Sequence, residues 1–354
     1  MTDVLLFGAS GFLGRQVRDL LTRDGRVSGL HCPGRADLDL LAARPADVVS
    51  LLRAVRPSVV LNCAGRMSGG YDELMRGNAL ATAVIIEAMA QAAPGARFVR
   101  LGSAAEYGPT PPGHAVHEQD PARPVSGYGI SHLAGTQLVE QAAADGRVDG
   151  ASLRVFNPVG PGLTGESVLG RARDLLASGV RDLDLGPLGA YRDFVDVRDV
   201  GRAVVSAAFA PDLPERVFNV GGGRAVPVRE AIALLAGEAG FTGEIRESAP
   251  PPAARPPSPG AAPTSPASGT SSAGNPSSPC PTRSRPCYER PKPHTGFLPP
   301  EPAGKGEGGT RARRFHTTAP VGGCGVGTQV EGVRAFASAI SAISRVGWVP
   351  AAGS

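Results

Sequence analysis

The first 248 residues predict an α/β protein with a doubly wound parallel sheet. Two observations indicate this fold class: short apolar runs alternate with helical patterns, and a glycine-rich turn joins the first run to the first helical pattern. Continuous apolar runs are typical of parallel strands covered by helices on both faces. A third observation limits the folded part, because the composition changes abruptly near residue 249.

The expected strands and helices follow one another in regular alternation. Five apolar runs are the candidate strands: residues 4–7, 27–31, 59–63, 98–101 and 151–156. Four stretches between them have apolar residues at helical spacing: residues 14–22, 45–55, 79–92 and 131–144. Strand–helix alternation of this kind requires crossover connections and therefore parallel pairing.

Beyond residue 249 the sequence predicts a disordered tail over residues 249–354. Residues 250–302 hold 17 of the 34 prolines of the chain, and Ser, Gly, Thr and Arg fill most of the remainder. Such a composition buries too little apolar surface to offset the entropy of ordering. Residues 333–346 have a short apolar pattern compatible with an isolated helix. Two explanations stay open: a native low-complexity tail, or a reading frame that slipped near codon 250.

Charge and composition narrow the class of protein. The net charge of +4 arises in the tail, since residues 1–248 hold 25 Arg against 28 Asp and Glu. We therefore expect no nucleic-acid partner. No apolar run approaches the roughly 20 residues of a membrane span, and the N-terminus lacks a basic secretory leader, so we expect a cytoplasmic protein without membrane contact. The five cysteines lack Cys-x-x-Cys spacing, and no metal site is expected.

The glycine-rich turn after the first strand predicts a dinucleotide site. Gly8 allows a tight turn, Gly11 lets the backbone approach a pyrophosphate, and Gly14 lets the helix pack on the strand. The helix N-terminus adds amide donors and the positive end of a dipole. The candidate cofactor-binding residues here are Gly8, Ser10, Gly11, Phe12, Leu13 and Gly14.

The end of the second strand bears on the choice between NAD and NADP. No acid stands there to bind the ribose 2′-hydroxyl, whereas Arg35 lies close enough to bind a 2′-phosphate. This favours NADP over NAD. In the alternative, Arg35 is solvated and Asp37 binds the ribose or adenine. Arg35, Asp37 and Leu38 are the candidate residues of this region.

The remaining motifs resemble one family. They are Asn62-Cys63-Ala64-Gly65 after the third strand, Asn78, residues 103–108, Tyr128 placed 25 residues after Ser103, and residues 153–162, 191–200 and 217–223. Together they resemble the extended short-chain dehydrogenase/reductases of the NAD-dependent epimerase/dehydratase family, which act on nucleotide sugars. The resemblance implies further cofactor-binding residues: Cys63, Ala64, Gly65, Asn78, Tyr128 and His132.

The resemblance also implies the domain organisation. Residues 1–155 would form the NAD(P)-binding Rossmann domain, and residues 156–248 the substrate-binding portion, interleaved with the last Rossmann elements. Family members continue with a strand and helices that close the substrate domain and usually contain Gly-Trp-x-Pro. Here only Gly347-Trp348-Val349-Pro350 is similar, far downstream. We therefore expect a small, incomplete substrate domain, with a homodimer as the candidate assembly.

The catalytic residues implied by the resemblance include one departure. Tyr128 would be the general acid/base, and Ser103 would hydrogen-bond the same substrate oxygen. The family has a lysine four residues after the tyrosine, which binds the nicotinamide ribose and lowers the pKa of the tyrosine. His132 stands at that position, and residues 1–250 contain no lysine. A free phenol has a pKa of about 10, so it needs a nearby cation to act near neutrality.

His132 permits two interpretations. A histidine one turn after Tyr128 lies on the same helix face and can donate a hydrogen bond to the ribose. Only its protonated form would supply the charge of the lysine, so we expect a pH limit of activity set by His132. We also expect His132→Lys to raise activity. Alternatively, catalysis is lost and the chain is a degenerate or repurposed cofactor-binding protein.

The sequence also favours some reactions of the family over others. Nucleotide-sugar dehydratases carry an acidic pair after the catalytic hydroxyl residue, where this chain has Ala104 and Ala105. Glu106 follows, and we expect it to point away on a strand. Residues 185–199 resemble GDP-4-keto-6-deoxy-mannose reductases. The expected reaction is reduction of an NDP-4-keto-6-deoxyhexose, with 4-epimerisation as the alternative, and the candidate substrate-binding residues are Asn157 and Arg192.

Overall fold

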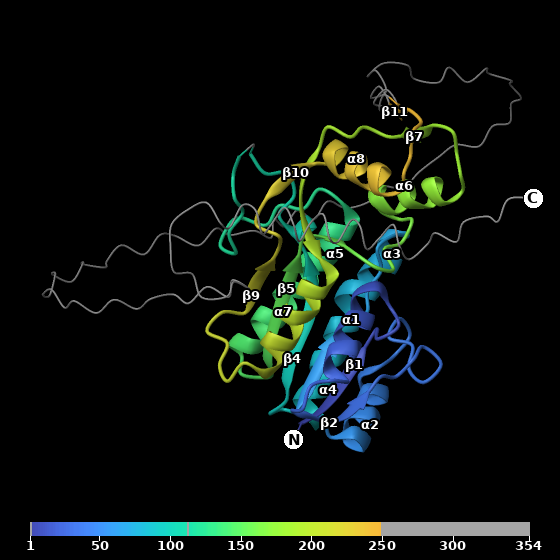
Figure 1. Ribbon diagram of the computed structural model, residues 1–354. Coiled ribbons are helices and arrows are strands. Elements are labelled where there is room, and N and C mark those ends of the chain that lie inside the picture. Colours follow the sequence, from blue (N-terminus) through green and yellow to red (C-terminus); the bar gives the residue numbers. More distant parts are fainter. Residues whose placement is uncertain (1, 112, 249–354) are drawn as a thin grey trace, which may run out of the picture. The chain divides into compact units, whose positions relative to one another are not determined.

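The computed structural model describes residues 2–111 and 113–248, and its centre is a six-stranded parallel sheet (Figure 1). The strand order is β2-β1-β3-β4-β5-β9, and every neighbouring pair is parallel. The strands are β1 (Thr2–Phe7), β2 (Val27–His31), β3 (Val59–Asn62), β4 (Arg97–Ser103), β5 (Asp149–Val155) and β9 (Val217–Val220). The predicted α/β fold with a parallel sheet is confirmed.

Helices cover both faces of this sheet. α1 (Phe12–Leu21) and α7 (Val197–Phe209) pack on one face; α2 (Pro45–Val55), α4 (Ala81–Ala92) and α5 (Gly127–Ala144) pack on the other. Side chains of β1 alternate between the two cores: Val4 and Leu6 pack with α1 and α7, and Leu5 and Phe7 pack with α2 and α4. This double cover explains the continuous apolar runs of the strands.

The strand order reverses at β1, which lies between β2 and β3. In an open parallel sheet, ligands bind outside the carboxyl ends of the strands at such a reversal. The register brings these ends together, because Phe7 pairs with Asn62 and Asn62 with Arg100. The residues that follow β1, β3 and β4 therefore meet at one edge of the sheet.

A second apolar core lies among residues 159–245. Leu169, Leu183, Phe194 and Ile232 belong to it, and Phe12 at the start of α1 packs against it. Its elements are β6 (Asn157–Val159), α6 (Val168–Ala177), β7 (Leu183–Leu185), β8 (Tyr191–Asp196), β10 (Ala225–Pro227), α8 (Val228–Glu238) and β11 (Ile245–Glu247). They form two small sheets, β10-β8-β6 and β11-β7.

Two segments differ locally from the expected elements. The helix expected over residues 79–92 is preceded by α3 (Tyr71–Leu74) and the π-helical turn η1 (Met75–Leu80). After β4 the chain forms the 3₁₀ turn η2 (Ala104–Glu106), so the placement of Glu106 on a strand was wrong. Ser103 causes the change: its hydroxyl accepts a hydrogen bond from the Ala105 amide and caps the turn.

The tail lies outside the described residues. The expected disorder of residues 249–354, the helical pattern at residues 333–346 and Gly347-Trp348-Val349-Pro350 all fall there. Within the described residues, no helix has the length and apolar content needed to cross a membrane.

Candidate active site

The glycine turn lies between β1 and the N-terminus of α1. Gly8 has φ +76°, and a Cβ at this position would lie 2.5 Å from the backbone nitrogen of Ala64. A Cβ on Gly14 would overlap the Gly8 carbonyl. Gly11 is the N-cap of α1 and provides no side-chain cap, so the first amides of the helix remain open donors. The turn therefore has the form of an anion cradle, with Ser10 exposed beside it and Phe12 and Leu13 beginning the helix.

The residues beyond β2 are compatible with binding of either NAD or NADP. Asp37 accepts a hydrogen bond from the Gly34 amide at 2.8 Å, which fixes a turn after the strand. Arg35 is exposed, and its Nε lies 4.0 Å from Asp39 Oδ1. Leu38 packs against the core beneath α2. Arg35 and Asp37 therefore both lie beyond the carboxyl end of β2, as expected.

Asn78 ties the loop after β3 to α5. Its side chain accepts a hydrogen bond from the Arg66 amide (2.8 Å) and donates to the Arg66 carbonyl (2.9 Å) and to Ser131 Oγ (3.0 Å). The π-helical turn η1 carries this buried side chain, and π-turns of this kind often occur at functional sites. The loop Cys63-Ala64-Gly65 is thereby held at the edge of the sheet. Burial raises the pKa of Cys63 to about 12, so its thiol stays protonated.

Ser103 and Tyr128, far apart in the sequence, are brought together. Ser103 ends β4 and is 8% exposed; Tyr128 lies in the first turn of α5, which Ser126 caps. Burial raises the pKa of Tyr128 above its ordinary value, against a hydrogen bond from Ser103 and the charge of Arg100, which lower it. The two hydroxyls are thus paired at the carboxyl edge of the sheet.

His132 is buried and its ring is neutral, so the expected pH limit of activity set by a protonated His132 near neutrality does not apply. Its ring packs edge-to-face on Tyr128, with 4.5 Å between ring centroids, and the residue is 7% exposed. Desolvation, followed by the charge of Arg100, lowers the pKa of His132 to about 3. A protonated His132 therefore does not supply the positive charge near neutral pH.

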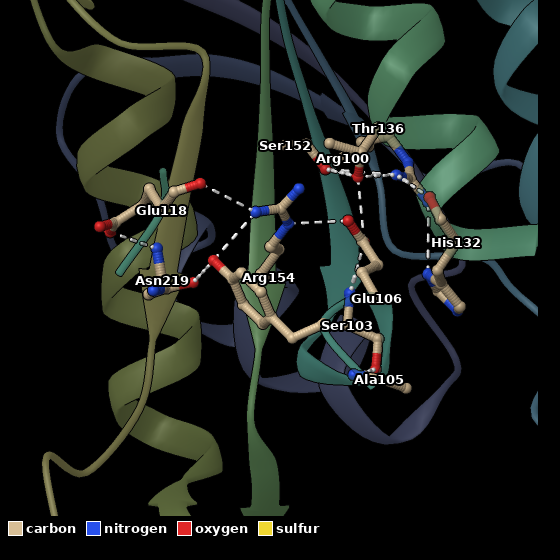
Figure 2. Close-up of polar contacts among 11 residues, drawn as sticks. Arg100, Ser103, Ala105, Glu106, Glu118, His132, Thr136, Ser152, Arg154 and Asn219 are labelled. Atoms are coloured by element: carbon tan, nitrogen blue, oxygen red, sulfur yellow. Dashed lines mark hydrogen bonds and ion pairs between the residues drawn. The ribbon is translucent and has the colours of Figure 1, made fainter. Parts of the chain in front are cut away.

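Arg100 is the site residue that sequence reasoning missed. It lies on β4, is 2% exposed and reaches under α5 (Figure 2). Its Nη2 lies 3.3 Å from His132 Nδ1. Its Nη1 donates to three oxygens: the His132 carbonyl (3.2 Å), Thr136 Oγ1 (3.0 Å) and Ser152 Oγ (3.2 Å). A charged residue inside an apolar parallel strand was the available signal.

A second buried arginine belongs to a different network. Arg154 on β5 forms an ion pair with Glu106 (2.8 Å) and donates to the Tyr107 hydroxyl (2.9 Å). That hydroxyl donates to Asn219 Oδ1 on β9 (2.7 Å). Glu106 also accepts from the Ser103 amide and from Thr136 (Figure 2). The carboxylate of Glu106 is therefore occupied by structural contacts.

The candidate substrate-binding residues lie on β6 and β8, which are neighbouring strands of the β10-β8-β6 sheet. Asn157 Nδ2 donates to the Asp193 carbonyl (2.9 Å), and the exposed Arg192 donates from Nη1 to the Tyr191 carbonyl (2.8 Å). Across residues 2–111 and 113–248, no hydrogen bond or ion pair joins either residue to Ser103 or Tyr128. The same residues contain no cluster of three or more side chains that could hold a metal ion.

Known proteins are similar to this chain in sequence and in fold. The family model "NAD dependent epimerase/dehydratase family" matches residues 4–221. A dTDP-6-deoxy-L-talose 4-dehydrogenase (NAD(P)(+)) of Kitasatospora kifunensis is 39% identical over 268 residues, which are 72% of this chain and 84% of the relative. A GDP-6-deoxy-D-mannose reductase of Pseudomonas aeruginosa is 27% identical over 65% of this chain and 77% of its own length.

A solved structure agrees with these relatives. RMD from Pseudomonas aeruginosa, in complex with NADPH, superposes with a TM-score of 0.63 at 25% identity, covering 71% of this chain and 86% of its own. The glycine cradle after β1, the Ser103–Tyr128 pair and the parallel sheet occur in the region that the family model matches. The chain belongs to the NAD-dependent epimerase/dehydratase family, and the relatives described above are dehydrogenases and reductases of nucleotide sugars.

Proposed function

We propose that this protein is an NAD(P)-dependent oxidoreductase acting at carbon 4 of a nucleotide-linked 6-deoxyhexose. In the reductive direction it converts the 4-keto sugar to an alcohol. The observation that carries the proposal is the Ser103–Tyr128 hydroxyl pair, which lies at the same sheet edge as the Gly8–Gly14 cradle. The relative with 39% identity is named for dehydrogenation at this carbon, the same chemistry in reverse.

The hydroxyls of Ser103 and Tyr128 have different roles at the substrate oxygen. A nicotinamide cofactor supplies a hydride to the carbonyl carbon. Tyr128 donates its phenolic proton to the oxygen as negative charge develops there, and Ser103 hydrogen-bonds the same oxygen and orients it. In the oxidative direction Tyr128 accepts the proton. Because burial raises the pKa of Tyr128, the direction that begins from the protonated phenol is reduction.

Binding of the substrate diphosphate is assigned to Arg192, with Asn157 nearby. An exposed guanidinium bound only to a backbone carbonyl is free to form charge-assisted hydrogen bonds with phosphate oxygens. The nucleotide is proposed to be dTDP, since the dTDP-sugar relative is more similar than the GDP-sugar relative. Residues 156–248 would form the substrate side, next to a cofactor domain of residues 1–155.

NADPH is proposed as the preferred reductant, with Arg35 as the determinant. The side chain of Arg35 is 72% exposed and held only by a 4.0 Å contact with Asp39, so it can turn toward a 2′-phosphate. The solved relative described above was in complex with NADPH. Replacement of Arg35 by Ser should reduce the preference for NADPH over NADH.

The proposal is tested by incubating the protein with NADPH or NADH and the 4-keto-6-deoxyhexoses of dTDP and GDP. We expect oxidation of NADPH, followed at 340 nm, with formation of one mole of 6-deoxyhexose nucleotide per mole of cofactor. Tyr128→Phe should lower kcat/KM by about 10²-fold or more. The control is Tyr71→Phe, which removes the hydroxyl of a tyrosine that is 77% exposed.

Two outcomes would replace this proposal. Interconversion of 4-epimers with bound NAD and no net oxidation would show a 4-epimerase. Cofactor binding without turnover of any sugar nucleotide would show a protein that has kept the site and lost the reaction.

A further inference from the structure

Resting on the proposed function, we propose that Arg100 and His132 together replace the lysine that follows the catalytic tyrosine in this family. Arg100 is the fixed positive charge beneath Tyr128. His132 is a neutral hydrogen-bond donor to the nicotinamide ribose, and Arg100 holds its tautomer. His132 is thus the residue that contacts the cofactor, and Arg100 is a positioning residue that acts through His132 and Tyr128.

The tautomer follows from one contact. Nη2 of Arg100 lies 3.3 Å from Nδ1 of His132, and a guanidinium has donors only. Nδ1 must therefore be the acceptor, and the proton of the neutral ring is on Nε2. The pKa of about 3 keeps the ring neutral at ordinary pH. In the described part of the chain Nε2 has no hydrogen-bond partner, so its N–H can bind a ribose hydroxyl.

The charge of Arg100 is the second observation. Three neutral oxygens and one ring nitrogen surround its guanidinium, and no carboxylate of the described residues is within ion-pair distance. The Glu106 carboxylate is linked to it through Thr136 Oγ1 and is already paired with Arg154. Two buried arginines thus share one carboxylate. A buried charge without a partner is costly, and a Tyr128 phenolate would be its counter-charge.

The helix is built to admit this guanidinium. A Cβ on Gly135 of α5 would lie 2.8 Å from Cζ of Arg100 and 2.7 Å from the Asn78 carbonyl. A glycine in a helix interior lowers helix stability relative to alanine, so the space has a structural cost. The middle of α5 therefore carries a glycine where Arg100 and the Asn78 carbonyl of η1 lie close to the helix backbone.

The groups that act on Tyr128 come from each element around it. They are Ser103 and Arg100 from β4, Glu106 from η2 and the His132 ring from α5. Arg100 and the Ser103 hydrogen bond lower the pKa of Tyr128, and Glu106 raises it. Since His132 is neutral, the only positive charge among these groups is on Arg100. Loss of Arg100 should therefore raise the pKa of Tyr128, and loss of the His132 ring should not mimic that effect.

The first test needs no substrate. In ¹⁵N-histidine NMR of the full chain, we expect His132 to appear as the neutral Nε2–H tautomer without titration from pH 5 to 9; His132→Gln assigns its resonances. Arg100→Met should give a mixed tautomer and weaken NADPH binding roughly five- to tenfold, the loss of one hydrogen bond. The matched control is Arg97→Met, on the same strand but paired with Asp149 and the Ala207 carbonyl on the α7 side.

The second test separates charge from tautomer. The limb of the kcat/KM profile that reports Tyr128 should move to higher pH by about one unit or more in Arg100→Met. Arg100→Lys keeps the positive charge, so that limb should stay near its original pH, whereas His132 should no longer be held in one tautomer. This variant serves as the test of the charge if Arg100→Met does not fold.

A His132 that carries its proton on Nδ1, or an unchanged tautomer and NADPH affinity in both variants, would overturn the proposal. If no sugar nucleotide is turned over, the proposed function fails, while the tautomer and NADPH affinity still test this proposal.

Discussion

Arg154 and Arg100 are both buried at the carboxyl edge of the sheet, yet their surroundings differ. Arg154 has an ion pair with Glu106, a hydrogen bond to Tyr107 and one to the Glu118 carbonyl. Arg100 has no carboxylate partner in the described residues, and its Nε is buried without a hydrogen bond. Arg154 has a direct ion pair with Glu106, whereas Arg100 is connected to the same carboxylate only through Thr136 (Figure 2).

The difference separates structural from functional use of a buried charge. The Arg154 network joins β5, η2 and β9, so its charges cancel within the scaffold. The Arg100 charge has no direct ion-pair partner in the described residues, and it lies next to Tyr128 and His132, the two rings of the site. Strained or underpaired groups persist where function needs them, at a cost in stability.

Removal of Arg154 should have the largest effect on stability. Arg154→Met leaves the fully buried Glu106 carboxylate without its partner, which typically costs about 3–5 kcal/mol. Urea unfolding would measure the loss. In the double variant with Glu106→Gln most of the loss should be recovered, since no unpaired charge remains. A loss below about 1 kcal/mol in Arg154→Met would show that the pair does not hold the scaffold.

Removal of Arg100 should cost much less stability than removal of Arg154. Arg100→Met deletes a buried charge that has no direct ion-pair partner in the described residues, but it also removes the donor of three hydrogen bonds, so the free energy of unfolding should stay within about 2 kcal/mol of the wild type. Activity should fall in the same variant, because Tyr128 loses the charge that lowers its pKa. Urea unfolding and steady-state kinetics on one preparation would check both. Destabilisation as large as that of Arg154→Met would make the two arginines equivalent and remove the contrast.

His132 predicts a pH dependence of stability. Its pKa is about 3 in the folded protein and about 6.5 when unfolded, so the unfolded state binds more protons between these values. The contribution of His132 is complete above about pH 6.5 and is lost as pH falls toward 3, by about 1.4 kcal/mol per pH unit. Urea unfolding at pH 7, 6 and 5 should show this decline. In His132→Gln the decline should be shallower; equal slopes would mean that His132 is not the buried neutral group.

Much of the fold could be predicted from the sequence, because periodicity and glycine positions are local properties. The strand over residues 27–31 and the helix over residues 45–55 have the predicted bounds. The Ser103–Tyr128 pair was also expected, from its spacing within the family resemblance. The helix expected at residues 79–92 was incomplete, since the π-helical turn before it depends on the contacts of Asn78 with a loop and with α5.

The role of Arg100 could not be predicted in the same way. Its partners are His132, Thr136 and Ser152, which are 32 to 52 residues away and come together only when β4, α5 and β5 pack. The burial of His132, which keeps the ring neutral, is likewise a property of the packed helix. Sequence alone placed a histidine where a lysine was expected, and the structure shows where a positive charge lies.

The central claim, that Arg100 supplies this charge, is tested most directly by a double-mutant cycle in kcat/KM. The sequence predicts that His132→Lys raises activity, but Arg100 Nη2 lies 3.3 Å from the ring that the lysine would replace, and two adjacent cations repel. The four proteins are the wild type, His132→Lys, Arg100→Met and the double variant. We predict that His132→Lys does not exceed the wild type, whereas the same change restores activity to Arg100→Met. An equal gain from lysine in both backgrounds would contradict the account, since the charge of Arg100 would then be irrelevant to Tyr128.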